Sequence, residues 1–303
     1  MKKISVSFFN PFEKCSFNEL PISRQAFSRA GNLGNVSYTI NDINADWHVV
    51  GTWIENIDDL LGNKILYLQQ EPPEIRLPSK DILDKCTLAL TFFNFEHKIP
   101  QILAPPALQW TYDISAKSIK GKGHVYEKVN NNYLEEMLFT PIPEKKKKCS
   151  IVLSAKQMIE GHKKRIIFAE ELKRKFKNEI DIFGFGFKPI DNKKDAIDPY
   201  YYSIALENST INNWWTEKIA DVFLGYTCPI YYGCSNITEF FDKSSLIEID
   251  INNIEHSLSI IEKAIENTQI INMSNIIEAR RSILLDFNML SLIATAINRF
   301  EKI

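Results

Sequence analysis

Residues 200–233 read "YYYSIALENSTINNWWTEKIADVFLGYTCPIYYG", two apolar runs separated by a polar loop and an amphipathic segment. Tyr202–Leu206 has the aromatic and β-branched composition of a buried strand, and 229–233 has it again. Between them, the loop 207–213 leads into Trp214–Leu224, where apolar residues recur at helical spacing. A strand, a loop, a helix and a second strand in this order predict a crossover between parallel strands. The loop then follows a strand's carboxyl end, where parallel sheets bind ligands.

The start of the predicted helix carries groups that suit a nucleotide diphosphate. Trp214, Glu217, Lys218 and Asp221 share one helical face by their spacing. The aromatic ring can lie on a base or a sugar, the carboxylate can accept from vicinal hydroxyls, and the ammonium can meet phosphate oxygens near the helix N-terminus. The spacing fits equally an amphipathic helix with a surface Glu–Lys pair and a core tryptophan. Trp215 points about 100° away, so we expect it to pack against the sheet.

Strands and helices alternate along the rest of the chain, which predicts an α/β fold with largely parallel sheets. In the segment 161–177, Phe168, Leu172 and Phe176 recur every four residues, as on the buried face of a helix. We expect the other strands in the ranges 3–9, 46–53, 64–70, 88–92, 149–155 and 179–186, and further helices at 55–61 and 274–302.

The segment 141–150, "PIPEKKKKCS", interrupts both helical and strand patterns and marks the predicted domain boundary. We therefore expect two Rossmann-like domains, at 1–145 and 149–303, with the helix 274–302 closing the second domain and Ser274 as its N-cap. In such an architecture the cleft between the domains is the expected ligand site.

Composition excludes several classes of protein. The 303 residues carry a formal net charge of −2, so no strong field attracts nucleic acid or a membrane. No apolar run reaches the length that a membrane-spanning helix needs. The five cysteines are scattered without zinc-ligand spacing, which indicates reduced thiols, no structural metal and a cytoplasmic protein.

The segment 200–242 resembles the donor-binding motif of the family 10 glycosyltransferases, the α-1,3/1,4-fucosyltransferases. About forty residues match that motif in order and spacing, and the chain departs from it in two places. Leu206 stands where a phenylalanine is usual, and Trp214 stands where a tyrosine or another aromatic is common. The matching residues are Leu206-Glu207-Asn208-Ser209, Trp214, Thr216-Glu217-Lys218 and Pro229-Ile230-Tyr231-Tyr232-Gly233.

The resemblance implies the GT-B architecture, two Rossmann-like domains that face a central cleft, with GDP-fucose bound mainly by the C-terminal domain. It implies that Glu217 binds ribose or sugar hydroxyls, that Lys218 meets the diphosphate and that Asn208 contacts the fucose or orders the loop. Glu207 is expected to fix the loop. Arg165, followed by Phe168 and Leu172 as in the family, is the implied partner of the diphosphate.

In the N-terminal domain the resemblance implies a glutamate that follows a strand and acts as the catalytic base. Glu71 follows the predicted strand 64–70, and Glu74 is its competitor. Trp110 and Tyr112 are candidates for stacking on an acceptor sugar, with core packing as the simpler interpretation.

These residues imply an inverting transfer of L-fucose from GDP-β-L-fucose to a glycan hydroxyl, with one displacement and a carboxylate base. The chain contains no D-x-D motif, which favours a mechanism that needs neither metal nor cofactor. The expected acceptor is an oligosaccharide or a lipid-linked glycan, with an α-1,3 or α-1,4 linkage to N-acetylglucosamine or glucose.

Three alternatives stay open from the sequence. One is the same fold with another GDP-linked deoxysugar or heptose as donor. A second is a binding protein for carbohydrate or nucleotide without catalysis. A DNA-modifying enzyme is disfavoured, because there is no basic stripe for nucleic acid. The sequence leaves a homodimer and a location at the inner membrane face open.

Overall fold

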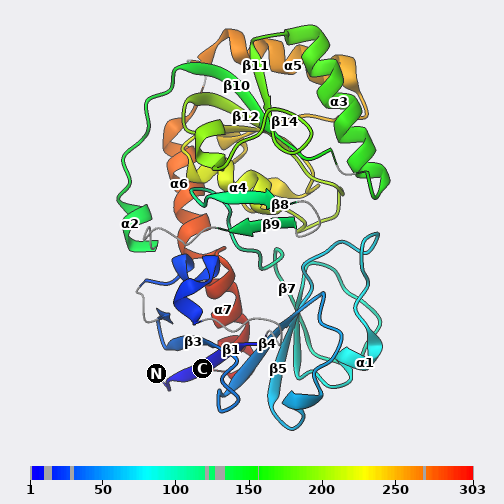
Figure 1. Ribbon diagram of the computed structural model, residues 1–303, viewed down its shortest axis with the longest axis vertical. Helices are drawn as coiled ribbons and strands as arrows, with labels where there is room; N and C mark the ends of the chain where they lie inside the picture. Colours follow the sequence, from blue (N-terminus) through cyan, green and yellow to red (C-terminus); the bar gives the residue numbers. More distant parts are fainter. Residues whose placement is uncertain are drawn as a thin grey trace. The chain divides into compact units, whose positions relative to one another are not determined.

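The computed structural model describes residues 2–9, 16–27, 31–119, 123–126, 134–155, 157–268 and 271–302. The chain forms two compact units, which are described separately (Figure 1). Unit 1 comprises Met1–Gln109, Val129–Thr140 and Leu284–Ile303, and unit 2 comprises Trp110–Lys128 and Pro141–Ile283. Each unit is built on a mainly or wholly parallel sheet with helices, which confirms the predicted α/β class.

In the sheet of unit 1, the direction in which the chain adds successive strands reverses next to β1. From β1 the chain continues to β3 on one side and then crosses to β4 on the other side, so the topological switch point lies between β1 and β4. All pairs are parallel except β2 with β3. The strands, in spatial order, are β2 (Asn32–Leu33), β3 (Val36–Ile40), β1 (Ile4–Phe8), β4 (Trp47–Gly51), β5 (Lys64–Leu68), β6 (Leu88–Thr91) and β7 (Gln101–Leu103).

Apolar side chains alternate between the two faces of this sheet. Leu66 and Leu68 lie in one core cluster with α7 (Met289–Glu301), whereas Ile65 and Tyr67 lie in a second cluster with α1 (Lys80–Leu83). The shorter helical segments of unit 1 are η1 (Phe17–Glu19), η2 (Pro21–Gln25), η3 (Asp58–Leu60) and α2 (Leu134–Leu138).

Unit 2 contains five parallel strands in the order β11 (Ile180–Phe183), β10 (Lys147–Val152), β12 (Tyr200–Leu206), β13 (Cys228–Tyr232) and β14 (Ile247–Glu248). From β10 the chain first moves outward to β11 and then returns to β12 on the other side. The switch point of this sheet therefore lies between β10 and β12. A separate antiparallel pair consists of β8 (Ala116–Ile119) and β9 (Gly123–Tyr126).

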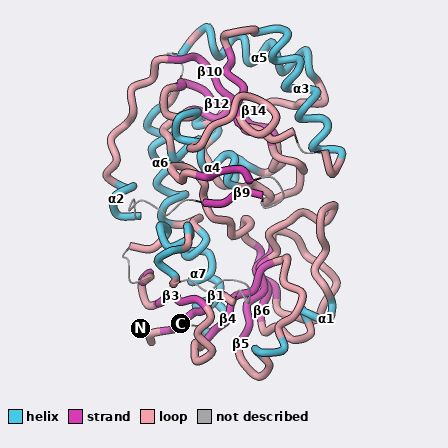
Figure 2. The backbone as a smooth tube through the Cα atoms, viewed as in Figure 1, coloured by secondary structure: helices cyan, strands magenta, loops and turns pink. Residues whose placement is uncertain are grey.

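Helices cover both faces of the sheet in unit 2, because right-handed crossovers that run in opposite directions place α3 and α4 on opposite sides. Lys175 of α3 pairs with Glu262 of α5 at 2.8 Å, and these two helices lie side by side in Figure 2. Arg280 of α6 donates to the Leu224 carbonyl of α4 at 3.0 Å. The helices are α3 (Glu160–Phe176), α4 (Glu217–Leu224), α5 (Ile254–Glu266) and α6 (Met273–Leu285), with short segments η4 (Lys193–Ala196), η5 (Ile237–Glu239) and η6 (Lys243–Ser245).

The division into units differs from the predicted domains in three places. Residues 141–145, predicted in the first domain, belong to unit 2. Residues 110–128 belong to unit 2, where Asp221 of α4 accepts hydrogen bonds from the backbone N–H groups of Thr111 and Tyr112. At the other end, residues 284–303 belong to unit 1. A break at Asn288 separates α6 from α7, since its side chain accepts from the Ser291 N–H at 2.8 Å and caps a new helix.

The single helix predicted at 274–302 is therefore two helices. Ser274 lies inside α6, so it is not the N-cap that the sequence suggested. Among the described residues no single helix is long and apolar enough to cross a membrane, and α6 and α7 pass that test only as a pair. The described cysteines are free thiols, as predicted, and Cys15 lies outside the described residues.

Candidate functional site

The predicted donor residues gather at the switch point of unit 2. The loop 207–216 leaves the carboxyl end of β12, and α3 begins one loop after β10. This crevice beside two diverging crossovers is where open α/β sheets bind ligands. Arg165 on α3 donates from Nη1 to the carbonyl of Leu206, the last residue of β12, at 3.2 Å. Arg165, a candidate ligand residue, thus joins α3 to the end of β12.

Glu207 holds the loop in place from beneath. Its carboxylate is fully buried and accepts from the Thr216 N–H at 2.8 Å and from the Thr216 hydroxyl at 2.8 and 2.9 Å. Lys218 Nζ lies 3.1 Å from its other oxygen, which neutralises the buried charge. A side chain at Gly233 would meet the Glu207 Cγ at 2.5 Å, so only glycine fits there. This geometry matches the loop-fixing role expected for Glu207.

The helix starts three residues later than the sequence suggested. Thr216 is the N-cap, its hydroxyl accepting from the Lys218 N–H, and α4 begins at Glu217. Trp214 lies before the helix, so the prediction that it shares a helical face with Glu217 and Lys218 is wrong. Its side chain is 2% exposed and supports the loop from within. A stacking contact between Trp214 and a ligand would require the loop to move.

Trp215 is buried in an aromatic cluster, as its packing role predicted. Its ring lies edge-on to Phe240 and Phe241, with centroids 6.0 and 5.1 Å apart. These two phenylalanines follow β13 in the chain. Glu217 and Lys218, the two residues that follow the N-cap Thr216, form an ion pair, with Lys218 Nζ 3.5 Å from Glu217 Oε1.

The charges at the start of α4 stay ionised despite burial. Burial by itself raises the pKa of Glu217, but the positive charges of Lys218 and Lys193 and a hydrogen bond from Thr216 bring it down to about 2. Burial lowers the pKa of Lys218, and the carboxylates of Glu207 and Glu217 outweigh that effect and raise it. An ammonium and a carboxylate are therefore both present at neutral pH.

Two buried polar atoms of this crevice have no hydrogen-bond partner among the described residues. They are Nε of Arg165, whose side chain is 5% exposed, and Oδ1 of Asn208. Burial lowers the pKa of Arg165, and the charges of Glu207 and Glu217 oppose that shift. Unsatisfied buried polar groups are costly, so an open donor on α3 and an open acceptor on the loop that α3 touches indicate a place for a polar ligand.

A tight contact sets the position of Arg165. A Cβ on Gly161 would lie 1.8 Å from the backbone oxygen of Asn208, so the first turn of α3 touches the loop directly. Arg165 follows on the same helical face, one turn later. Asp221 accepts from the Thr111 hydroxyl and from Lys193, each at 2.7 Å. It anchors the segment 110–112.

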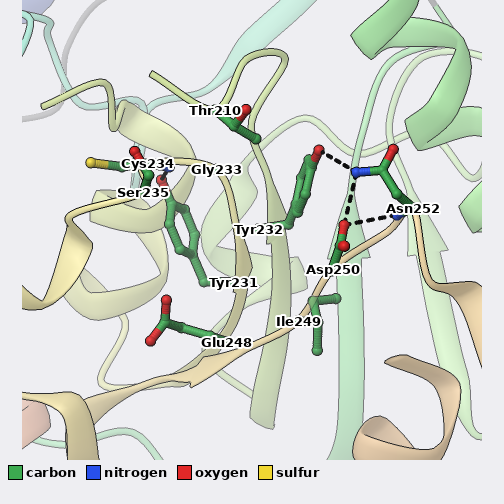
Figure 3. Close-up of a pocket in the computed structure, with 10 residues that line it drawn as sticks. All are labelled: Thr210, Tyr231, Tyr232, Gly233, Cys234, Ser235, Glu248, Ile249, Asp250 and Asn252. Carbon is green, nitrogen blue, oxygen red and sulfur yellow. Dashed lines mark hydrogen bonds between the residues drawn. The ribbon is translucent and has the colours of Figure 1, made fainter. Parts of the chain in front are cut away.

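Beside the crevice, a pocket of about 310 Å³ opens at the carboxyl ends of β13 and β14 (Figure 3). Asn252 Nδ2 donates to the Tyr232 hydroxyl at 3.1 Å and to Asp250 at 2.8 Å on one side of it. Because Glu248 and Asp250 are carboxylates, the pocket suits hydroxyl or amino groups and disfavours phosphate. Its lining includes none of the predicted donor residues but shares Thr210 with their loop.

Glu71 lies in unit 1, just beyond the carboxyl end of β5. Its Oε1 accepts from the indole Nε1 of Trp53 at 3.2 Å. The buried amide of Gln69 donates to the backbone oxygens of Glu71 and Arg76, at 2.6 and 2.9 Å, and so ties both ends of the turn 71–76. Glu74 is exposed on the same turn. The indole of Trp53 thus orients the carboxylate of Glu71.

Sequence reasoning missed Trp53, Gln69 and Arg76, which surround Glu71. The signal was available for Trp53, because it is the last residue of the predicted strand 46–53 and so lies at a carboxyl edge. By contrast, Trp110 and Tyr112 are buried, which confirms their simpler interpretation as core residues. No group of three or more histidine, cysteine, aspartate or glutamate residues in the described ranges has the geometry of a metal site.

The C-terminal part of the chain is similar to known proteins. Residues 142–268 match the model of the glycosyltransferase family 10 (fucosyltransferase) C-terminal domain. The α-(1,3)-fucosyltransferase FucT of Helicobacter pylori is 27% identical over 74 residues, which are 24% of this chain and 16% of that protein. The matched stretch thus spans only about a sixth of this relative's length.

Solved structures extend the likeness to the whole fold. A crystal structure of α1,3-fucosyltransferase has a TM-score of 0.52 and 15% identity, over 95% of this chain and 92% of that chain. A structure of α1,3-fucosyltransferase with GDP-fucose has a TM-score of 0.51 and 15% identity, over 93% and 90%. At this identity the likeness concerns the fold, which is GT-B. Residues 142–268 are therefore similar to the C-terminal domain of the family 10 glycosyltransferases, and the fold of the chain is GT-B.

Proposed function

We propose that the chain is an inverting fucosyltransferase that moves L-fucose from GDP-β-L-fucose to a hydroxyl of a glycan acceptor, without a metal ion. Unit 2 binds the donor and unit 1 supplies the base. The observation that carries the proposal is the pair of open polar atoms, Arg165 Nε and Asn208 Oδ1, at the switch point of a family 10 domain. The H. pylori relative is named as an α-(1,3)-fucosyltransferase, and one structural neighbour holds GDP-fucose.

The cations of unit 2 suit the diphosphate of the donor. Arg165 keeps Nε open for a phosphate oxygen, and Lys218 lies at the N-terminus of α4, where a helix favours negative charge. Glu217, ionised beside Lys218, accepts from the ribose hydroxyls. As the bond to fucose breaks, negative charge grows on the diphosphate, and the fixed cations stabilise it.

Inversion requires one displacement at the anomeric carbon. The acceptor hydroxyl attacks from the face opposite the diphosphate, and its proton passes to a carboxylate, for which we propose Glu71 rather than Glu74. The hydrogen bond from Trp53 and the tie through Gln69 hold Glu71 in one orientation, which a base needs. The proposed acceptor is a glycan, free or lipid-linked, that receives fucose in an α-1,3 or α-1,4 linkage on N-acetylglucosamine or glucose.

A screen of sugar nucleotides for GDP release tests the donor assignment. We expect release from GDP-fucose in the presence of a β-galactoside that contains N-acetylglucosamine, and we expect the same rate with a chelator present. Release from another GDP-deoxysugar or a GDP-heptose alone would replace fucose as the donor. Binding of GDP without turnover on any donor would favour the non-catalytic alternative.

Glu71→Gln tests the base. We expect transfer to fall by about 10²-fold or more, because the amide cannot take the proton, while GDP binds with wild-type affinity. Glu74→Gln is the matched control on the same turn and should retain transfer. If Glu74→Gln loses transfer and Glu71→Gln keeps it, the roles of the two glutamates are reversed.

A further inference from the structure

Trp53 is exceptional among the tryptophans of this chain. All five lie in the described ranges, and the other four are buried, whereas Trp53 is 55% exposed. Exposing a tryptophan is unfavourable in water, and an exposed aromatic at the carboxyl edge of a parallel sheet indicates a binding surface. Trp53 lies two residues beyond the end of β4, the strand at the switch point of unit 1.

The ring of Trp53 is held in place, unlike a loose surface side chain. Its Nε1 donates to Glu71 Oε1 at 3.2 Å, and the guanidinium of Arg76 lies over the ring, 4.8 Å from its centroid. Arg76 covers one face of the indole. The exposed area therefore leaves the opposite face open to a ligand.

The backbone on both sides of this contact is fixed as well. The buried hydroxyl of Thr52 donates to the Leu68 carbonyl at 3.0 Å and accepts from the Gln70 N–H at 2.6 Å. Trp53 and Glu71 are the next residues after Thr52 and Gln70, so this double hydrogen bond sets their separation. A platform and a carboxylate are thus preorganised side by side.

Resting on the proposed function, we infer that Trp53 has two roles at the acceptor site. The C–H face of the acceptor pyranose stacks on the open face of the indole, which brings a sugar hydroxyl to Glu71. The indole N–H acts on Glu71 itself, since a hydrogen bond to a carboxylate oxygen favours the ionised form, which is the form that can take the proton. The other charged groups on the turn are Glu74 and Arg76.

Two substitutions separate these roles. Trp53→Phe keeps an aromatic face and removes the N–H, so we expect kcat to fall about tenfold and the acid side of the pH–rate profile to move to higher pH by about one pH unit. Trp53→Ala removes the platform too, so we expect the acceptor KM to rise about tenfold in addition. Unit 2 is untouched, so GDP affinity, measured by titration calorimetry, should equal that of the wild type.

Saturation-transfer NMR with a β-galactoside that contains N-acetylglucosamine gives a readout independent of turnover. We expect transfer from the protein to the sugar C–H protons in the wild type and in Trp53→Phe, and its loss in Trp53→Ala. If Trp53→Ala binds the acceptor like the wild type, the platform is refuted. An unchanged pH–rate profile in Trp53→Phe refutes the action on Glu71. If the wild type transfers no sugar yet Trp53→Ala loses acceptor binding, the proposed function fails and the platform stands.

Discussion

Glu217, which we propose to bind the donor, also contributes to the stability of the fold. Its carboxylate lies 3.5 Å from the ammonium of Lys218 at the first turn of α4. Burial raises its pKa, yet the neighbouring cations lower it to about 2, below the ordinary value of 4.5. A carboxyl group whose pKa is lowered by folding stabilises the folded state above its ordinary pKa, and this contribution is lost as the pH falls toward the folded value.

Glu217→Gln should therefore cost at most about 3 kcal/mol of unfolding free energy at pH 7. The difference from the wild type should shrink as the pH falls from about 4.5 toward 2, because the wild-type carboxylate then becomes protonated. Urea unfolding of both proteins between pH 3 and 7 measures this. Glu248→Gln, at an exposed carboxylate, is the control and should change stability little. A difference that is the same at pH 3 and pH 7 would contradict the lowered pKa.

At the scale of secondary-structure elements, α3 packs directly against the loop that follows β12, because Gly161 has no side chain. Gly161 lies in the first turn of α3, and the backbone oxygen of Asn208 occupies the place of its Cβ. In an isolated helix, alanine would stabilise this position by about 1 kcal/mol relative to glycine. In this protein we expect alanine at position 161 to destabilise the fold instead, because its Cβ would either clash with the backbone of Asn208 or displace the loop.

Gly161→Ala should consequently lower the melting temperature and weaken GDP binding, since Arg165 and Asn208 move apart. Thermal unfolding followed by circular dichroism, together with GDP titration, checks both effects. Lys163→Ala is exposed on the same helix and should leave both quantities near the wild type. A stabilised Gly161→Ala variant with unchanged GDP affinity would show that α3 does not touch the loop.

Much of the fold is predictable at this scale, and the failures have physical causes. Strands such as 64–68 and 228–232 are largely apolar runs whose composition indicates a strand without further information. The start of α4 was misplaced because Trp214 continues the helical spacing, whereas Thr216 binds Glu207 and caps the helix at Glu217. Such a cap depends on a contact between residues nine positions apart, which spacing within one helix does not reveal.

The candidate site was predictable where it follows a family motif and not where it depends on packing. Arg165, Asn208 and Lys218 match motif positions, and the structure brings them to one crevice. Trp53 and Gln69 act through contacts that join β4 to β5. Because strand pairing brings these residues together, their common role becomes visible only in the sheet.

At the scale of the whole molecule, the C-terminal helix α7 belongs to the same unit as the N-terminal strands. The Tyr38 hydroxyl of β3 donates to the Leu290 carbonyl of α7 at 2.6 Å, and Ile293 is fully buried in the same core cluster. Ile283, fully buried at the end of α6, belongs to unit 2. Two isoleucines ten positions apart therefore stabilise different units.

Ile293→Ala and Ile283→Ala should each cost about 2–5 kcal/mol, but in different places. Hydrogen exchange monitored by mass spectrometry should show faster exchange in β1, β4 and β5 for Ile293→Ala. It should show faster exchange in β10, β12 and β13 for Ile283→Ala. Each variant is the control for the other, and equal effects of Ile293→Ala on both sheets would refute the division into two units.

The central claim is that the diphosphate of the donor lies on Arg165. Titration calorimetry with GDP and with GMP, on the wild type and on Arg165→Met, tests it without an acceptor. The account predicts that the wild type binds GDP more tightly than GMP, and that Arg165→Met weakens GDP binding about 10- to 100-fold and reduces this preference. Circular dichroism should show that the variant is folded. Unchanged GDP affinity in a folded Arg165→Met protein would contradict the account.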